Sequence, residues 1–231
     1  MHNGTNLCTS CKTRIVHAIR TIRLGEIKLA AGCSDCGYRG HPDALVFSHV
    51  RGEDRHSVAL MRSSAWQRVL DEIAKCDVTC ANCHAIRWAA QMREKFRDHQ
   101  HSKSSGMLLA RRAAVAQVKL EAGCIDCGYA GCPEALQFDH VNGEKVSGIG
   151  RMTGFAQETL TAELAKCVVR CANCHAIRTA DLAGWDRFRT GSWTGIGDDT
   201  RQWALGKAQE VGVMDAGLVA AAVAGVLEIV R

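Results

Sequence analysis

Residues 124–178 read CIDCGYAGCPEALQFDHVNGEKVSGIGRMTGFAQETLTAELAKCVVRCANCHAIR, and this stretch decides the fold. Two cysteine pairs, each spaced C-x-x-C, stand on either side of Asp139-His140, and His175 directly follows the last cysteine. Four thiols in two such pairs are typical of a structural zinc site, where four thiolates form a tetrahedron around the ion. We therefore predict one zinc ion bound by the four cysteines of this stretch, Cys124, Cys127, Cys171 and Cys174.

The same pattern occurs a second time in the chain, with no gap between the copies. The run CANCHAIR occupies residues 80–87 and again residues 171–178, 91 positions later. Roughly half of the positions from Lys28 to Ala89 are identical to their counterparts. We interpret this as a tandem duplication of one module. The first copy therefore has predicted zinc ligands of its own, which are Cys33, Cys36, Cys80 and Cys83.

Composition supports metal binding over disulfides. The chain has 231 residues and 13 cysteines, and its first ten residues are polar and lack the apolar core of a signal peptide. We therefore expect a cytoplasmic protein, whose thiols stay reduced and bind zinc. Modules of about 60–70 residues bury little apolar surface, so a structural metal would stabilise them. The net charge of +5 is compatible with nucleic acid but is weak evidence alone.

The sequence predicts four consecutive regions. They are a helix with a first zinc module at 1–97, a polar linker at 98–106, a second zinc module at 107–183, and a Trp- and Gly-rich extension at 184–231.

The end of the extension, residues 213–230, reads as a helix that is apolar nearly all round and must be buried. It can pack within the chain, or residues 213–231 can form a homodimer contact. Its uninterrupted apolar run, residues 216–227, is too short to span a bilayer, so no membrane partner is expected. Another C-x-x-C pair, Cys8 and Cys11, has no matching pair; it is either half of a metal site completed by His2, His17 or another chain, or two free thiols.

The ordered set of Asp139-His140 and Cys171-x-x-Cys174-His175 resembles the HNH endonuclease family of phages and bacteria. The resemblance implies an α+β fold of two tandem zinc-braced ββα-metal modules, with flanking helices and a C-terminal apolar helix. It also implies that Asp139 and His175 hold a catalytic Mg²⁺ or Mn²⁺ ion, because carboxylate and imidazole ligands suit such ions. His140 would be the general base, since a neutral imidazole takes a proton near pH 7.

The resemblance is incomplete in both copies. Family members usually have Asn five positions before the third cysteine, where this chain has Lys166; Asn173 is a candidate substitute. In the first copy Ser48 stands where the second has Asp139, so we expect the first module to be degenerate. The predicted phosphate contacts are all basic side chains of the second module, namely Lys145, Arg151, Lys166 and Arg178.

Three functions follow from these patterns. The first is a metal-dependent DNA endonuclease that binds DNA mainly through phosphates, so that binding weakens steeply with salt. The second is a zinc-module DNA-binding regulator without catalysis. The third is a structural or assembly protein that oligomerises through its C-terminal helix.

Overall fold

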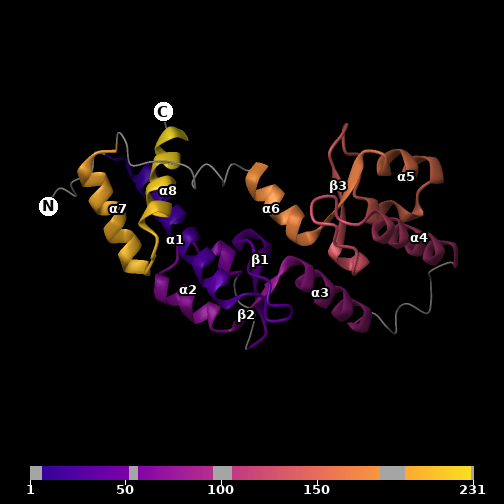
Figure 1. The fold of residues 1–231 in the computed structure, drawn as a ribbon, viewed down its shortest axis with the longest axis horizontal. Coiled ribbons are helices and arrows are strands. Elements are labelled where there is room, and N and C mark those ends of the chain that lie inside the picture. The colour runs from indigo at the N-terminus through magenta and orange to yellow at the C-terminus, as the bar shows by residue number, and fades with distance from the viewer. Residues whose placement is uncertain (1–6, 52–56, 96–105, 183–195, 230–231) are drawn as a thin grey trace. The chain divides into compact units, whose positions relative to one another are not determined.

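The computed structural model describes residues 7–51, 57–95, 106–182 and 196–229 (Figure 1). The chain forms two compact units, one of residues 1–79 with 179–231 and one of residues 80–178. Both are mixed helix and strand, and the described residues form two sheets of two strands each. None of the helices within the described residues has both the length and the apolarity that crossing a membrane would need.

The elements of the first unit come from both ends of the chain. In order they are α1 (Thr9–Ala31), η1 (Pro42–Ala44), β1 (Leu45–His49), η2 (Val58–Leu60), α2 (Trp66–Ile73), β2 (Cys76–Cys80), α7 (Asp198–Val211) and α8 (Ala216–Ile229). Strands β1 and β2 pair with each other, and the boundary between the units falls at the last residue of β2.

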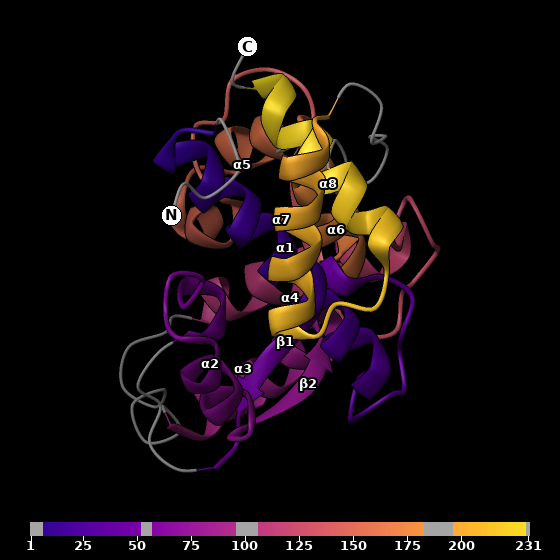
Figure 2. The same ribbon diagram turned by 90° about the vertical axis from the view of Figure 1, so that its left-hand side faces the viewer.

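Helices α1, α7 and α8 pack around one apolar core in this unit, and Figure 2 shows α7 and α8 beside α1. Ile15 and Ile19 of α1 are buried against Val219 and Val223 of α8. Gly212 allows the sharp turn between α7 and α8, because it takes a positive φ of 76° that favours glycine. The apolar sequence of α8 is therefore explained by packing inside one chain, and the predicted homodimer through residues 213–231 stays a prediction.

The second unit contains the Asp-His motif and the second set of cysteines. Its elements are α3 (Ala81–Lys95), α4 (Gly106–Ala122), η4 (Pro133–Ala135), β3 (Leu136–His140), η5 (Ile149–Gly154), α5 (Gln157–Leu164), β4 (Cys167–Cys171) and α6 (Ala172–Leu182). Strands β3 and β4 are antiparallel, with Leu136 opposite Cys171 and His140 opposite Cys167. Helix α6 begins directly after β4, so His175 lies in its first turns.

The duplication is visible in the bounds of the elements. Strands β1 and β2 become β3 and β4 when their residue numbers are shifted by 91, and α2 becomes α5 in the same way. The two compact units are defined by contacts, and the four predicted regions stay a prediction. The extension belongs to the first unit because α7 and α8 pack on α1, and α3 belongs to the second unit because it contacts η4. The predicted linker at 98–106 lies outside the described residues except for Gly106, the first residue of α4.

Candidate metal and catalytic site

The eight cysteines predicted as zinc ligands form two groups of four. In each group the sulfur atoms all lie within 4.8 Å of one another; the groups are Cys33, Cys36, Cys80 and Cys83, and Cys124, Cys127, Cys171 and Cys174. The sulfurs of Cys127 and Cys171 are 3.8 Å apart. Zinc–sulfur bonds of about 2.3 Å give a tetrahedron with edges of about 3.8 Å, so this spacing fits zinc. Each group could hold a structural zinc ion.

The local backbone explains why each cysteine pair can share one ion. Gly128 follows Cys127 with a φ of 72°, and its N–H donates to the carbonyl of Cys124 at 2.8 Å, which closes a tight turn. At the start of α6 the Cys174 N–H donates to the Cys171 sulfur at 3.4 Å. Burial opposes ionisation of Cys124, but backbone N–H groups that include that of Cys171 outweigh it and lower the pKa of this thiol to about 7. A thiol with this pKa is readily available as the thiolate that zinc binds. Burial raises the pKa of Cys127 and of Cys174 in the same group, so zinc binding there would release the protons of these two thiols.

Asp139 of β3 and His175 of α6 lie close to each other. The Nε2 atom of His175 lies 3.7 Å from Oδ1 of Asp139, and the Asp139 side chain is mostly buried. The other carboxylate oxygen, Oδ2, accepts from Nη1 of Arg170 and lies 3.3 Å from Nε of Arg178. Arg170 also donates through Nε to Asp126 at 2.7 Å. The Asp139 carboxylate therefore has imidazole on one side and two guanidinium groups on the other.

His140, the next residue, contacts a carboxylate that the sequence motifs did not indicate. Its Nε2 lies 2.8 Å from Oε1 of Glu163, a residue of α5 whose side chain is only 2% exposed. Glu163 Oε1 also accepts the N–H of Val146, and Oε2 accepts from Nζ of Lys166 at 2.7 Å. The hydrogen bond from Lys166, followed by that from His140, lowers the pKa of Glu163 to about 2. A carboxylate only accepts hydrogen bonds, so Nε2 of His140 carries a proton, and in the neutral imidazole Nδ1 is then the nitrogen with the lone pair.

The first repeat has the same histidine and glutamate but lacks the acidic residue beside them. His49 Nε2 lies 2.8 Å from Oε1 of Glu72, which also pairs with Lys75. Ser48 occupies the position of Asp139, and buried Thr79 occupies that of Arg170. The charged pair of the second repeat is thus a pair of hydroxyl side chains in the first. Because both partners of the ion pair are replaced together, neither of these two positions in the first repeat holds a charge without its partner.

Two other predicted site residues, Asn173 and Lys166, are hydrogen-bonded to groups of the protein itself. Asn173 is buried, and its Oδ1 accepts the N–H of Asn82 at 3.0 Å, while Asn82 Oδ1 accepts the N–H of Asn173 at 3.0 Å. This reciprocal contact joins the starts of α3 and α6, so the amide group is engaged in helix packing. Lys166 is engaged by Glu163 and by the carbonyl of Glu144.

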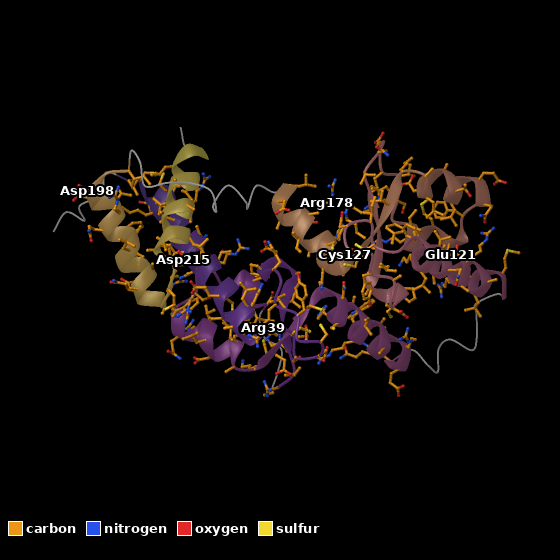
Figure 3. All side chains as sticks on the ribbon, viewed as in Figure 1. Arg39, Glu121, Cys127, Arg178, Asp198 and Asp215 are labelled. Carbon is orange, nitrogen blue, oxygen red and sulfur yellow. The ribbon has the colours of Figure 1, made fainter. Side chains whose placement is uncertain are left out.

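The remaining predicted DNA contacts are accessible. Lys145 and Arg151 are exposed, and the side chain of Arg178 is 39% exposed. Figure 3 labels Arg178 on α6 and also Cys127 of the four-cysteine group. The partly exposed guanidinium group of Arg178 therefore lies beside the mostly buried carboxylate of Asp139.

No protein-family model, curated protein or solved structure matches this chain. Its function is therefore inferred from the chemistry of these side chains. Glu163 and Arg170 are the functional candidates that sequence reasoning missed. Glu163 had a signal in the sequence, because Glu, Lys and Cys recur at the same spacing in both repeats, as Glu72-x-x-Lys75-Cys76 and Glu163-x-x-Lys166-Cys167.

Proposed function

We propose that the second module, residues 107–183, is an HNH-type, metal-dependent endonuclease module that hydrolyses phosphodiester bonds of DNA. The observation that carries the proposal is the 3.7 Å separation of His175 Nε2 and Asp139 Oδ1. His140, the residue after Asp139, is in addition oriented by the carboxylate of Glu163. Asp139, His140 and His175 are the three side chains that the resemblance to HNH endonucleases picks out from the sequence. Asp139 and His175 lie side by side, and His140 directly follows Asp139 in β3, which supports a shared role.

The spacing of Asp139 and His175 fits two ligands of one divalent ion. Ligand atoms at about 2.1 Å from a metal lie at most about 4.2 Å apart, and about 3.0 Å apart when they are neighbours in an octahedron. The separation of 3.7 Å falls between these values. Mg²⁺ or Mn²⁺ suits a site with one carboxylate and one imidazole. When bound, such an ion supplies stabilisation of negative charge on the scissile phosphate.

His140 is the general base in this proposal. Ionised Glu163 accepts a hydrogen bond from the Nε2–H group of His140, so Nδ1 is the atom that can accept a proton from water. Glu163 lies in turn between Lys166 and the backbone N–H of Val146, which hold it in place. The arrangement therefore fixes both the tautomer and the direction of the imidazole ring. That orientation is what general-base catalysis requires.

Arg178 would bind the phosphate close to Asp139, because its guanidinium already lies beside this carboxylate and is partly exposed. Lys145 and Arg151 are exposed basic side chains of the same unit and would add contacts to neighbouring phosphates. Contacts of this kind carry little sequence information, so the module would cleave with weak sequence preference. Ser48 offers no carboxylate in the first module, and we assign that module to binding or support.

One observation favours a second candidate, a zinc-module protein that binds DNA without cutting it. Asp139 is paired with two guanidinium groups, those of Arg170 and Arg178. These positive charges reduce the attraction of the carboxylate for a metal ion. In the binding protein, Asp139 would only hold the two arginines in position.

A cleavage assay separates the two candidates. Supercoiled plasmid is incubated with the zinc-loaded full chain and either Mg²⁺ or Mn²⁺, and His140→Ala is compared with His49→Ala, the equivalent change in the first module. The endonuclease predicts nicking that His140→Ala abolishes and His49→Ala leaves unchanged. Salt-sensitive binding of the plasmid without any nicking would establish the binding protein in its place. Equal activity of wild type and His140→Ala would also overturn the proposed mechanism.

A further inference from the structure

Cys8 and Cys11 form a thiol pair that the two four-cysteine groups do not include. The pair lies at the start of α1, where the Cys8 sulfur takes the N-cap position and accepts the N–H of Cys11 at 3.5 Å. The two sulfur atoms are 3.2 Å apart. Each thiol is therefore positioned to react with its partner without rearrangement of the helix.

The two cysteines differ in their exposure and chemistry. Cys8 is exposed, whereas Cys11 is buried at 5% exposure. The hydrogen bond from the Cys11 N–H, followed by that from the Cys11 thiol, lowers the pKa of Cys8. The hydrogen bond with Cys8 raises the pKa of Cys11, and burial raises it further. An accessible thiolate at a helix N-terminus is the attacking group of a dithiol, and a protected second thiol is the resolving group.

The surroundings of the pair fit a dithiol better than a metal site. Among the described residues, the groups of three or more His, Cys, Asp or Glu side chains that could share a metal ion are the two four-cysteine groups, and neither contains Cys8 or Cys11. The sulfur separation of 3.2 Å is shorter than the edge of about 3.8 Å that tetrahedral zinc imposes. His17 is one of the metal ligands that the sequence suggested, and its Nε2 atom forms a hydrogen bond with Oγ of Ser63 at 3.1 Å. His2 lies outside the described residues.

We propose that Cys8 and Cys11 are a redox-active dithiol that is oxidised by a small-molecule disulfide of the glutathione type. The Cys8 thiolate attacks one sulfur of the disulfide, which forms a mixed disulfide and expels one thiolate. The Cys11 thiol then loses its proton and attacks the Cys8 sulfur, which forms the Cys8–Cys11 bond and expels the second small thiol. The chain loses two electrons and two protons in total, and the small disulfide is reduced to two thiols.

The proposed disulfide would act through reactivity and have little effect on stability. It closes a ring over only four residues, and the stabilisation from a crosslink grows with the length of the loop that it closes. A spacing this short is instead suited to rapid opening and closing. The proposal is independent of the nuclease function.

The test uses the zinc-loaded full chain and oxidised glutathione, with the product measured by intact-protein and peptide mass spectrometry. The wild type is expected to lose two hydrogen masses and to give a Cys8–Cys11 crosslinked peptide, while its zinc content stays constant. Cys11→Ser is expected to stop at one glutathionyl adduct on Cys8, and Cys8→Ser is expected to form neither product. Cys132→Ser is the control, because Cys132 lies outside the four-cysteine groups and its pKa is raised by burial and by Glu134; it should behave as the wild type.

Two results would overturn the proposal. One is zinc in excess of the two four-cysteine sites that Cys8→Ser removes, which would make the pair a metal ligand set. The other is a wild-type chain in which Cys8 reacts no faster than Cys132, or forms no bond to Cys11.

Discussion

The Nε2–H group of His140 donates a hydrogen bond to Glu163 over 2.8 Å, and the side chain of Glu163 is almost completely buried. The same bond, of the same length, joins His49 to Glu72 in the first repeat. Two copies of one module thus share an oriented imidazole, although only the second has a carboxylate next to it in the sequence. The two repeats therefore share the His–Glu contact and differ at the residue before the histidine, which is Asp139 in the second and Ser48 in the first. Equivalent substitutions in the two repeats can be compared within one chain.

We expect Glu163→Gln to lower DNA cleavage by about 10- to 100-fold, because an amide no longer fixes the tautomer of His140 and general-base catalysis depends on it. Glu72→Gln makes the same change in the first module, where His49 has Ser48 as its neighbour, and should leave cleavage unchanged. Initial nicking rates of the two variants give the comparison. Equal losses in both would mean that the glutamates act only through folding.

The low pKa of Glu163 predicts how its contribution to stability depends on pH. Hydrogen bonds from Lys166 and His140 lower this pKa from an ordinary 4.5 to about 2. A lowered carboxyl pKa stabilises the folded state at pH values above 4.5, and the stabilisation is lost as the pH falls towards 2.

We therefore expect Glu163→Gln to have a lower urea midpoint than wild type at pH 5, with a difference that becomes smaller as the pH falls below 4.5. Protonation of the zinc-binding thiols affects wild type and variant alike and cancels from the difference. A difference that is as large at pH 3 as at pH 5 would contradict the assignment.

The ion pair of Asp139 and Arg170 should behave as a single unit when both are changed to the residues of the first repeat. Asp139→Ser leaves mostly buried Arg170 with Asp126 as its remaining acidic partner, and Arg170→Thr removes a donor from buried Asp139. We expect each single change to destabilise the chain and the double change to cost less than their sum, with a coupling of about 0.5–3 kcal/mol. Urea unfolding of the four proteins measures this coupling. Additive effects would show that the pair contributes nothing of its own.

Zinc should be required for folding, because each small module has a limited apolar core. We expect two zinc ions per chain, with Cys80→Ser and Cys171→Ser each losing one, as measured by elemental analysis. Zinc binding coupled to folding contributes on the order of 10–16 kcal/mol, so a strong chelator should remove most of the far-ultraviolet circular dichroism that the modules contribute. A metal-free chain that retained this signal would contradict the prediction.

Because α8 packs on α1 of the same chain, we expect the stability of the protein against unfolding not to depend on a second chain. Ile15 is completely buried in the core that α1 shares with α8, so Ile15→Ala should cost about 2–5 kcal/mol. Met214→Ala, at an 86% exposed position, should change stability by less than about 0.5 kcal/mol. The unfolding midpoint of the wild type should be the same at low and high protein concentration. A midpoint that rises with concentration would instead support the predicted homodimer through residues 213–231.

The sequence alone predicted the features that depend on short spacing along the chain. The C-x-x-C pairs bring two thiols together within one turn, and the duplication repeats them, so the membership of both four-cysteine groups follows from spacing and repetition. Asp139 and His175 also stand out in the sequence, because Asp139 lies between the two cysteine pairs and His175 directly follows the last cysteine.

Tertiary structure alone decided which distant residues complete these sites. Glu163 reaches His140 from α5, Arg170 reaches Asp139 from the partner strand, and α8 is covered by α1 from the opposite end of the chain. The physical reason is that spacing along the chain fixes only neighbouring atoms. The partners of a buried charge or an apolar helix are chosen by packing, which depends on all the elements at once.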